Sequence, residues 1–309
     1  MPQRDKIEWG AGLPQIFDSG VVDMARVEQF ARRSEALGYD SLWVTDMHLR
    51  GYPVLDPLAL LGYVAALTTR VRLGTSVLIS PVYDPILLAR ALAALDQISD
   101  GRLIVGIGLG TAQRLYPRYG ISTAGAVGRF VEGLQLMNAL WTSSSTTFEG
   151  RYWHADQVVM EPKPVQKPRP PVWFGGGHPN ALRRAVRHAD GWMGAGISST
   201  RTFVENSRLL RRYLEEADRD PTTFQIAKRI YVGLDSDGAR GKRRTKEWLG
   251  RVYSGFSIDE GTIVSGDVRE CTDRIAEVTA ETPDLLLLHP MFDETEQIEA
   301  LAQEVIPAL

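Results

Sequence analysis

The chain has 309 residues and a formal net charge of −3; 44% of its residues are hydrophobic and 24% are charged. This composition is typical of a globular protein with a large core. The slightly acidic balance argues against a surface that binds nucleic acid or an anionic membrane. No apolar run approaches the ~20 residues of a membrane helix, and the N-terminus lacks the pattern of a signal peptide. We therefore expect a soluble, cytoplasmic protein.

Strand-like and helix-like segments alternate along the first half of the chain. The helices are indicated by apolar faces and by end signals such as Gly38, and the strands by short runs of β-favouring residues. We expect strands at 7–13, 41–45, 71–79 and 102–108, and helices at 23–37, 57–68, 85–98 and 124–141. Such alternation implies parallel strands joined by helical crossovers.

Residues 142–171 interrupt this alternation. A Ser/Thr run at 143–147 predicts a loop, residues 148–159 could form a short hairpin, and five prolines between Pro162 and Pro171 exclude regular helix. A linker between two domains is the alternative. Because the alternation resumes at once, we interpret 142–171 as an insertion.

The second half of the chain repeats the pattern. We expect strands at 172–174, 191–195, 225–234 and 284–288, and helices at 179–188, 202–217, 267–280 and 294–308. Residues 235–251 are helical in part, and 252–266 are a candidate mobile loop. Eight strand–helix units in this length predict one domain over 1–309, a (β/α)8 TIM barrel with an insertion at 142–171.

A doubly wound sheet is the alternative fold, because Gly106-x-Gly108-x-Gly110 resembles a dinucleotide-binding loop. The spacing departs from G-x-G-x-x-G, and the motif falls in mid-chain instead of opening a domain. The barrel is therefore the better interpretation.

In a barrel the active site is built from the carboxyl ends of the strands. The second strand ends in an acid and an imidazole, Asp46 and His48, separated by Met47. The other strand ends supply these candidates: 75–77; Gly108, Gly110 and Thr111; 175–178; 192–196; and His289.

The turn Gly175-Gly176-Gly177-His178 leads from a strand directly into a helix. Three glycines let backbone N–H groups approach an anion at a helix N-terminus, which predicts a phosphate site. His178 could add a charged contact or lie at the solvent-exposed rim. A tight turn with no ligand is the structural alternative.

Other chemistries are poorly supported. The five histidines lack a paired metal-binding spacing, and there is no Gly-x-Ser-x-Gly elbow, so we expect neither a metal centre nor a serine hydrolase. The single cysteine, Cys271, lies in a charged helical pattern and is interpreted as structural.

Taken together, the chain resembles the luciferase-like monooxygenase superfamily, the flavin- or deazaflavin-dependent (β/α)8 barrels. The resemblance covers nearly all residues. The matching segments, in family order, are 38–46 (Gly-Tyr-Asp-Ser-Leu-Trp-Val-Thr-Asp), 69–75, 93–103 with 106–110, 170–177 and 189–192.

The resemblance implies roles for particular residues. Asp46 would lie beside the cofactor ring, and Ser76 and Val77 would form the wall behind it, where the family often has a non-prolyl cis peptide. Gly176 and Gly177 would receive the cofactor phosphate, in agreement with the turn argument. Small-molecule substrates and a homodimer are implied in the same way.

Two cofactors are compatible with the resemblance, coenzyme F420 (a deazaflavin) and FMN. We favour a hydride-transferring F420 enzyme over an FMN-dependent monooxygenase that uses molecular oxygen, because arginine exceeds lysine in a manner typical of GC-rich actinobacterial genomes. The cofactor carries the chemistry in either case. A barrel that binds a flavin without turnover is a further alternative.

The chain departs from one subgroup of the family. Deazaflavin-dependent sugar-phosphate and alcohol dehydrogenases have a His directly after the acid, a Trp a few residues on, and a Glu after the fourth strand. Here those positions are Met47, Gly51 and Thr111. Methionine cannot accept a proton, so alcohol oxidation by that mechanism is not expected. His48 is the candidate replacement, although one residue along a strand points to the other face.

Overall fold

A computed structural model describes residues 6–17, 20–47, 51–253, 258 and 262–309. The fold is a (β/α)8 barrel, as predicted, with parallel strands that alternate with helices. By contacts the chain divides into two compact units. Unit 1 comprises the described residues of 1–14, 23–43 and 176–309, and unit 2 comprises those of 15–22 and 44–175. No helix in the described part of the chain is long and apolar enough to cross a membrane.

The strands of unit 1 pair in parallel around β12. This strand pairs with β1 on one side and with β10 on the other, in the registers Glu8↔Leu285 and Ala227↔Leu285. β10 also pairs with β9 and β11, and β1 pairs with β2. The bounds are β1 Glu8–Gly12, β2 Ser41–Val44, β9 Gly191–Gly194, β10 Gln225–Leu234, β11 Ile263–Gly266 and β12 Leu285–Pro290. Four leucines at 285–288 are fully buried, as expected of a strand covered on both faces.

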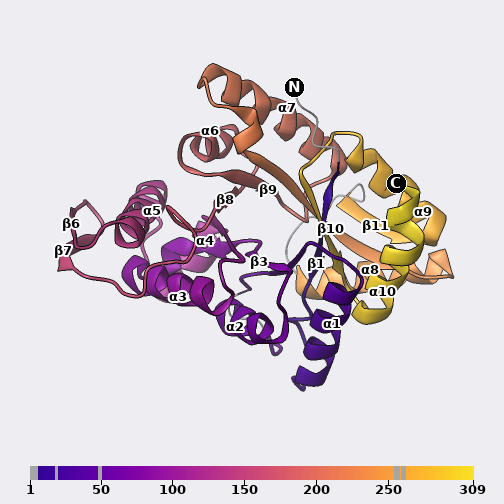
Figure 1. Cartoon of the computed structure of the whole chain (residues 1–309). Helices are drawn as coiled ribbons and strands as arrows, with labels where there is room; N and C mark the ends of the chain where they lie inside the picture. The colour runs from indigo at the N-terminus through magenta and orange to yellow at the C-terminus, as the bar shows by residue number, and fades with distance from the viewer. Residues whose placement is uncertain (1–5, 18–19, 48–50, 254–257, 259–261) are drawn as a thin grey trace. The chain divides into compact units, whose positions relative to one another are not determined.

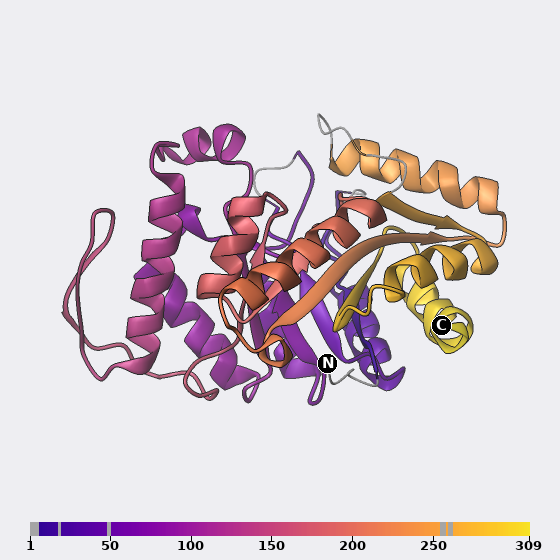
Figure 2. The ribbon, with the colours of Figure 1, turned by 90° about the horizontal axis from the view of Figure 1, so that it is seen from above.

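The helices of unit 1 begin at side-chain caps. Asp23 accepts from the N–H of Arg26 to start α1, and Asp267 forms a capping box with Glu270 at α9. The bounds are α1 Met24–Ala36, α6 Pro179–His188, α7 Thr200–Glu216, α8 Gly238–Val252, α9 Val268–Thr279 and α10 Glu294–Ala300, with a 3-10 turn at Pro221–Thr223. Helices α6 and α7 lie side by side (Figures 1 and 2).

Unit 2 contains the strands around β5, which pairs with β3, β4 and β8 in parallel. The strands are β3 Arg72–Thr75, β4 Leu78–Ile79, β5 Leu103–Gly108 and β8 Val172–Gly175. The helices are α2 Pro57–Leu67, α3 Pro85–Ile98, α4 Ala112–Leu115 and α5 Ala126–Thr142, with 3-10 turns at Ser80–Val82 and Tyr116–Tyr119. Asp56 and Asp84 cap α2 and α3, each before a proline at the first helical position.

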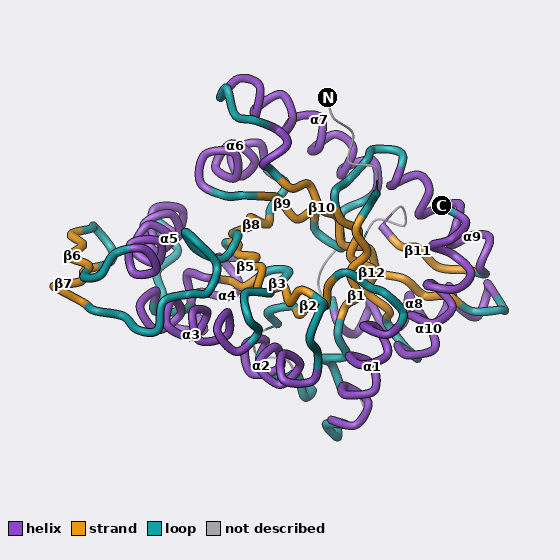
Figure 3. The backbone as a smooth tube through the Cα atoms, in the orientation of Figure 1, coloured by secondary structure: helices purple, strands orange, loops and turns teal. Residues whose placement is uncertain are grey.

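The insertion at 142–171 contains the predicted hairpin, formed by β6 Thr146–Glu149 and β7 His154–Val158, although it begins within the 143–147 segment that was expected to be a loop. It lies beside α5 (Figures 1 and 3). The Glu132 carboxylate on α5 accepts from the N–H groups of residues 151, 152 and 153, at 2.7–3.0 Å. Residues 159–171 have no regular helix or strand, as the prolines predict.

Three element predictions were wrong in detail. The strand expected at 71–79 is divided into β3 and β4, and the helix expected at 294–308 continues beyond Ala300 as a π-helix and a 3-10 turn. Residues 263–266 of the candidate loop form β11, whereas 254–257 and 259–261 lie outside the described residues. Helix α4 was not predicted, because four residues carry too little periodicity to be recognised.

Candidate functional site

The predicted cofactor residues fall in both units. Unit 2 holds Asp46, the 76–77 wall, the glycines after β5, Thr111 and Gly175, whereas unit 1 holds 176–178. We describe the two groups separately as the ring region and the phosphate turn. His48, the candidate acid–base residue, lies outside the described residues.

Asp46 is half-buried and lies two residues after the end of β2. Its Oδ2 atom accepts hydrogen bonds from the backbone N–H of Ile79 at 2.8 Å and from the hydroxyl of Tyr83 at 3.1 Å. Burial, and next the negative charge of Asp46, raise the pKa of Tyr83, so the phenol keeps its proton and remains a donor. Tyr83 was not among the predicted site residues, because its sequence context gives no sign of a carboxylate partner.

Gln15 fixes the strand end that precedes Asp46. Its amide nitrogen donates to the carbonyl oxygens of Thr45 and Leu55, both at 2.7 Å, and its amide oxygen accepts from the N–H of Thr45 at 2.9 Å. The side chain is 3% exposed. Because a buried amide with these partners has little freedom to rotate, it holds the backbone one residue before the acid.

The Ser76–Val77 peptide bond is cis, which confirms the expectation for this position. The adjacent Thr75 hydroxyl donates to the carbonyl of Gly106 at 2.7 Å and accepts from the N–H of the same glycine at 2.8 Å. A Cβ atom on Gly106 would lie 1.8 Å from the carbonyl oxygen of Thr75. This position on β5 therefore accommodates only glycine.

Three more glycines of unit 2 pack against the same segment. A Cβ on Gly108 or on Gly175 would lie 2.9 Å from a methyl group of Val77, and one on Gly110 would lie 2.8 Å from Ile79. The Gly106-x-Gly108-x-Gly110 pattern thus lets the 75–79 segment approach β5 closely. Thr111, the last predicted residue here, is exposed before α4.

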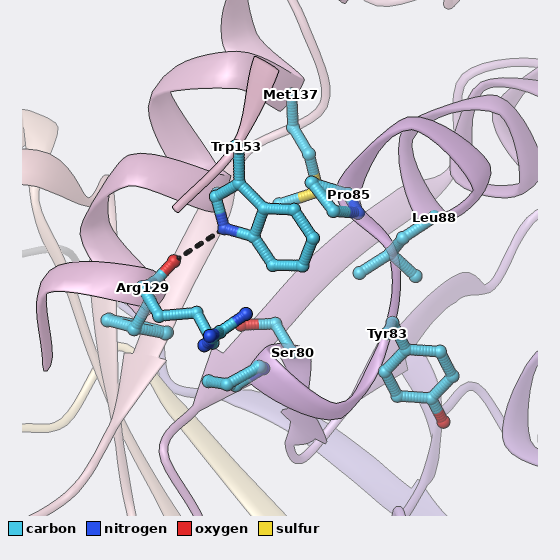
Figure 4. Close-up of a pocket in the computed structure, with 10 residues that line it drawn as sticks. Ser80, Tyr83, Pro85, Leu88, Arg129, Met137 and Trp153 are labelled. Carbon is cyan, nitrogen blue, oxygen red and sulfur yellow. Dashed lines mark hydrogen bonds between the residues drawn. The ribbon is translucent and has the colours of Figure 1, made fainter. Parts of the chain in front are cut away.

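A small pocket adjoins Tyr83 on the side of α3 and α5, with room for about one water molecule. Tyr83 and Arg129 line it, together with Trp153 from the insertion (Figure 4). The indole of Trp153 donates to the carbonyl of Arg129 at 3.1 Å, and the guanidinium carbon lies 5.2 Å from the centre of that ring. The insertion therefore contributes a fixed aromatic wall next to Tyr83.

The phosphate turn lies in unit 1. Gly176 has a positive φ of 117°, and its carbonyl accepts from the indole of Trp192 at 2.7 Å. A Cβ on Gly177 would lie 2.8 Å from the side-chain nitrogen of Asn206. His178 caps α6, since its Nδ1 atom accepts from the N–H of Asn180 at 3.2 Å. Residues 176–178 are exposed, so their backbone is open to a ligand.

Unit 1 also buries polar side chains on β10 that were not predicted. The ammonium of Lys228 donates to the Ser198 carbonyl at 2.7 Å and to its hydroxyl at 2.9 Å, and burial lowers the pKa of Lys228 to about 7. The Arg229 guanidinium lies over the Tyr231 ring, 5.2 Å from its centre, and donates to the hydroxyl of Tyr253 at 3.4 Å. The sequence signal was a Lys-Arg pair inside an apolar strand, where a buried charge is costly and therefore informative.

His289, a candidate at the end of β12, is buried against Tyr231, with ring centres 5.1 Å apart. Burial, and next the charge of Arg229, lower the pKa of His289 to about 3. The imidazole is therefore neutral near pH 7. Within the described ranges, no three His, Cys, Asp or Glu side chains cluster as metal ligands would.

Comparisons with known proteins agree with this geometry. The chain is 31% identical over 233 residues to an F420-dependent glucose-6-phosphate dehydrogenase of Kineococcus radiotolerans, covering 72% of this chain and 68% of that protein. It is 30% identical to the enzyme of the same name from Nakamurella multipartita, covering 80% and 73%.

Among solved structures, the coenzyme F420-dependent tetrahydromethanopterin reductase of Methanopyrus kandleri superimposes with a TM-score of 0.82 at 18% identity. The match covers 98% of this chain and 99% of that chain, and at this identity it supports the fold alone. The family model described as luciferase-like monooxygenase matches residues 11–259. The chain therefore belongs to the luciferase-like monooxygenase family and is an oxidoreductase.

Proposed function

We propose that this oxidoreductase uses coenzyme F420 to exchange a hydride with a small organic substrate. The observation that carries the proposal is the similarity to F420-dependent glucose-6-phosphate dehydrogenases at 30–31% identity over more than two thirds of each protein. The deazaflavin, when bound, supplies hydride transfer, and the protein supplies orientation.

The residues present fit such a cofactor in two ways. In the ring region, the Val77 side chain is held against Gly108 and Gly175, which gives the flat wall that a planar ring requires. In the phosphate turn, Gly176 and Gly177 expose backbone without a Cβ next to the N-terminus of α6. We assign the ring to Asp46, Ser76 and Val77, and the phosphate to 175–178. Gly108, Gly110 and Thr111 then border the ring.

The chain's own residues would position the Asp46 carboxylate and supply the group that moves a proton. Tyr83 and the N–H of Ile79 hold one oxygen of Asp46 in place, and this fixes the carboxylate for contact with a bound ring. Met47 cannot move a proton, so an acid–base step needs another group, and His48 is our candidate. The similarity does not require glucose 6-phosphate as the substrate, because Met47, Gly51 and Thr111 replace the residues expected in that subgroup.

An FMN-dependent monooxygenase is the second candidate function. The family model that matches the chain carries the monooxygenase description. FMN and F420 share a ring of similar shape and a phosphate, so the wall and the turn alone do not distinguish them. A flavin-binding barrel without turnover is a third candidate, motivated by Met47.

The test is a titration of the purified chain with oxidised F420 and, separately, with FMN, followed by cofactor fluorescence. We expect micromolar binding of F420 and weaker binding of FMN. Asp46→Ala should weaken F420 binding, whereas Asp156→Ala, on exposed β7, is the matched control and should leave it unchanged. Micromolar binding of FMN alone would overturn the F420 proposal. Single-turnover mixing with a substrate panel then separates an enzyme from a non-catalytic carrier.

A further inference from the structure

Helix α6 differs from the other basic helices of unit 1 in having no acidic residue and three arginines, Arg183, Arg184 and Arg187. No ion pair joins any of the three to a carboxylate of the described residues. Five arginines on other helices of unit 1 are paired: Arg26 with Glu294, Arg33 with Glu299, Arg201 with Glu205, Arg208 with Glu281 and Arg240 with Asp235. We call Arg183, Arg184 and Arg187 the α6 stripe.

The stripe runs away from the phosphate turn. Arg183 and Arg187 are spaced i, i+4 and therefore share one face of the helix, and Arg184 lies three residues before Arg187, next to that face. With a rise of about 1.5 Å per residue, they lie roughly 6–12 Å along α6 from Pro179, the first residue after the turn. Arg183 is held over the Tyr213 ring of α7 at 4.3 Å, and α6 and α7 lie side by side in unit 1 (Figures 1 and 2).

The electrostatic surroundings of the stripe are positive. The pKa of His188, at the end of α6, is lowered by burial and then by the charges of Arg187 and Arg184. Arg183 and Arg187 are exposed, and Arg184 is half-buried. The helix dipole stabilises cations in the last turn, which accounts for Arg187 and His188. It gives no such gain to Arg183 and Arg184 in the second turn, where Arg183 packs over the Tyr213 ring and neither guanidinium has an ion pair among the described residues.

We propose that the α6 stripe binds the anionic oligoglutamate tail of the cofactor. This inference rests on the proposed function. F420 continues beyond its phosphate as a lactyl group and a chain of glutamates, whereas FMN ends at its phosphate. A phosphate bound at Gly176 and Gly177 would lie next to the start of α6, within reach of groups that continue beyond it. Exposed guanidinium groups along that helix match a flexible chain of carboxylates.

The experiment measures the dissociation constants of three ligands by fluorescence: F420 with several glutamates, the phospholactyl form with none, and FMN. For the unmodified chain, we expect the glutamylated form to bind more tightly than the form without glutamate. The double variant Arg183→Gln/Arg187→Gln should weaken the glutamylated form by about two- to thirtyfold, since each exposed pair contributes about 0.2–1 kcal/mol. Its affinity for the form without glutamate and for FMN should hardly change.

The matched control is Arg243→Gln/Lys246→Gln on α8, which removes the same charge from exposed positions of unit 1. It should leave the glutamate-dependent difference intact. The difference in affinity between the two F420 forms should be present at about 0.01 M salt and absent at about 1 M salt, because the screening length falls from about 30 Å to about 3 Å. Equal affinities for both F420 forms, or equal losses in both double variants, would overturn this inference alone. Failure of every deazaflavin form to bind would overturn the proposed function and this inference with it.

Discussion

The ring region of unit 2 and the polar region of unit 1 are built in opposite ways. The ring region uses close approach of backbone, with Gly106, Gly108 and Gly175 packed against Thr75 and Val77. The polar region of unit 1 instead buries ionisable side chains on β10 and β12, namely Lys228, Arg229 and His289. In the ring region, a side chain larger than glycine would clash with the neighbouring segment. In the polar region, a buried ionisable group requires suitable partners.

This difference determines how each region fails. A steric contact fails abruptly and at every pH when an atom is added, because the backbone it meets cannot rotate away. A buried ionisable group fails gradually, as pH moves between its pKa in the folded chain and its pKa in the unfolded chain. The three predictions below test this contrast, from the largest expected effect to the smallest.

The substitution Gly106→Ala should have the largest effect. The new Cβ would lie 1.8 Å from the carbonyl oxygen of Thr75, which is backbone. We expect the free energy of unfolding to fall by at least about 4 kcal/mol, or the chain to fail to fold, since such values come from overpacked cores. Urea denaturation followed by circular dichroism measures the change.

The control for this prediction is Gly62→Ala on α2. A Cβ there meets nothing within 4 Å, and alanine suits a helix interior. Its free energy of unfolding should rise by about 0.5–1 kcal/mol. If Gly106→Ala were as stable as the unmodified chain, close backbone approach would not be what fixes the ring region.

Sequence reasoning was successful for this region because its signals are local. The alternation of strand-like and helix-like segments predicted the barrel, and the resemblance to the family implied the Ser76–Val77 cis peptide. The glycines themselves were assigned to a cofactor, whereas the structure also shows them in contact with Val77 and Ile79. A glycine pattern in the sequence indicates that a side chain is excluded at a position, but it does not identify the atom with which that side chain would clash.

The polar region was harder to predict because its contacts are distant in sequence. Lys228 meets Ser198 thirty residues away, and Arg229 donates to the hydroxyl of Tyr253, 24 residues away. No spacing rule connects such pairs, since strand order and register decide them. The division of 71–79 into β3 and β4 was missed for a similar reason. The β-favouring residues of this run give no sign of a break, and the interruption falls at Ser76 and Val77, between two strands that both pair with β5.

The second prediction concerns pH and His289. Its pKa is about 3 in the folded chain and about 6.5 when unfolded, so the unfolded chain binds the extra proton between these values. Stability is therefore lost as pH falls from about 6.5 towards 3. At pH 5 the loss assigned to His289 is about 2 kcal/mol. Urea denaturation at a series of pH values should show this slope, and His289→Asn should remove it.

The exposed His154 on β7 provides the control, because its substitution by Asn should leave the pH slope unchanged. The comparison uses the slope instead of the absolute stability, since replacing a buried ring also changes packing. An equally steep slope in His289→Asn would mean that other groups produce the acid sensitivity of unit 1.

The smallest effect is expected from Tyr83→Phe, which removes the hydroxyl that donates to the Asp46 carboxylate and adds no atom. The free energy of unfolding should fall by about 1 kcal/mol, because the N–H of Ile79 still holds the carboxylate and the site is only half-buried. F420 binding, measured by fluorescence, should weaken as well, since a carboxylate with one fewer donor is less fixed next to the ring.

Tyr39→Phe separates these two effects. Tyr39 donates to the carbonyl of Ile298 at 3.0 Å and is buried in unit 1, so its loss should cost a similar amount of stability. It has no contact with Asp46 among the hydrogen bonds described, so F420 binding should stay unchanged. If both variants weakened binding equally, the effect would follow from general destabilisation. If only Tyr83→Phe did so, a polar contact would act inside the otherwise steric ring region, and the contrast between the two regions would be one of degree.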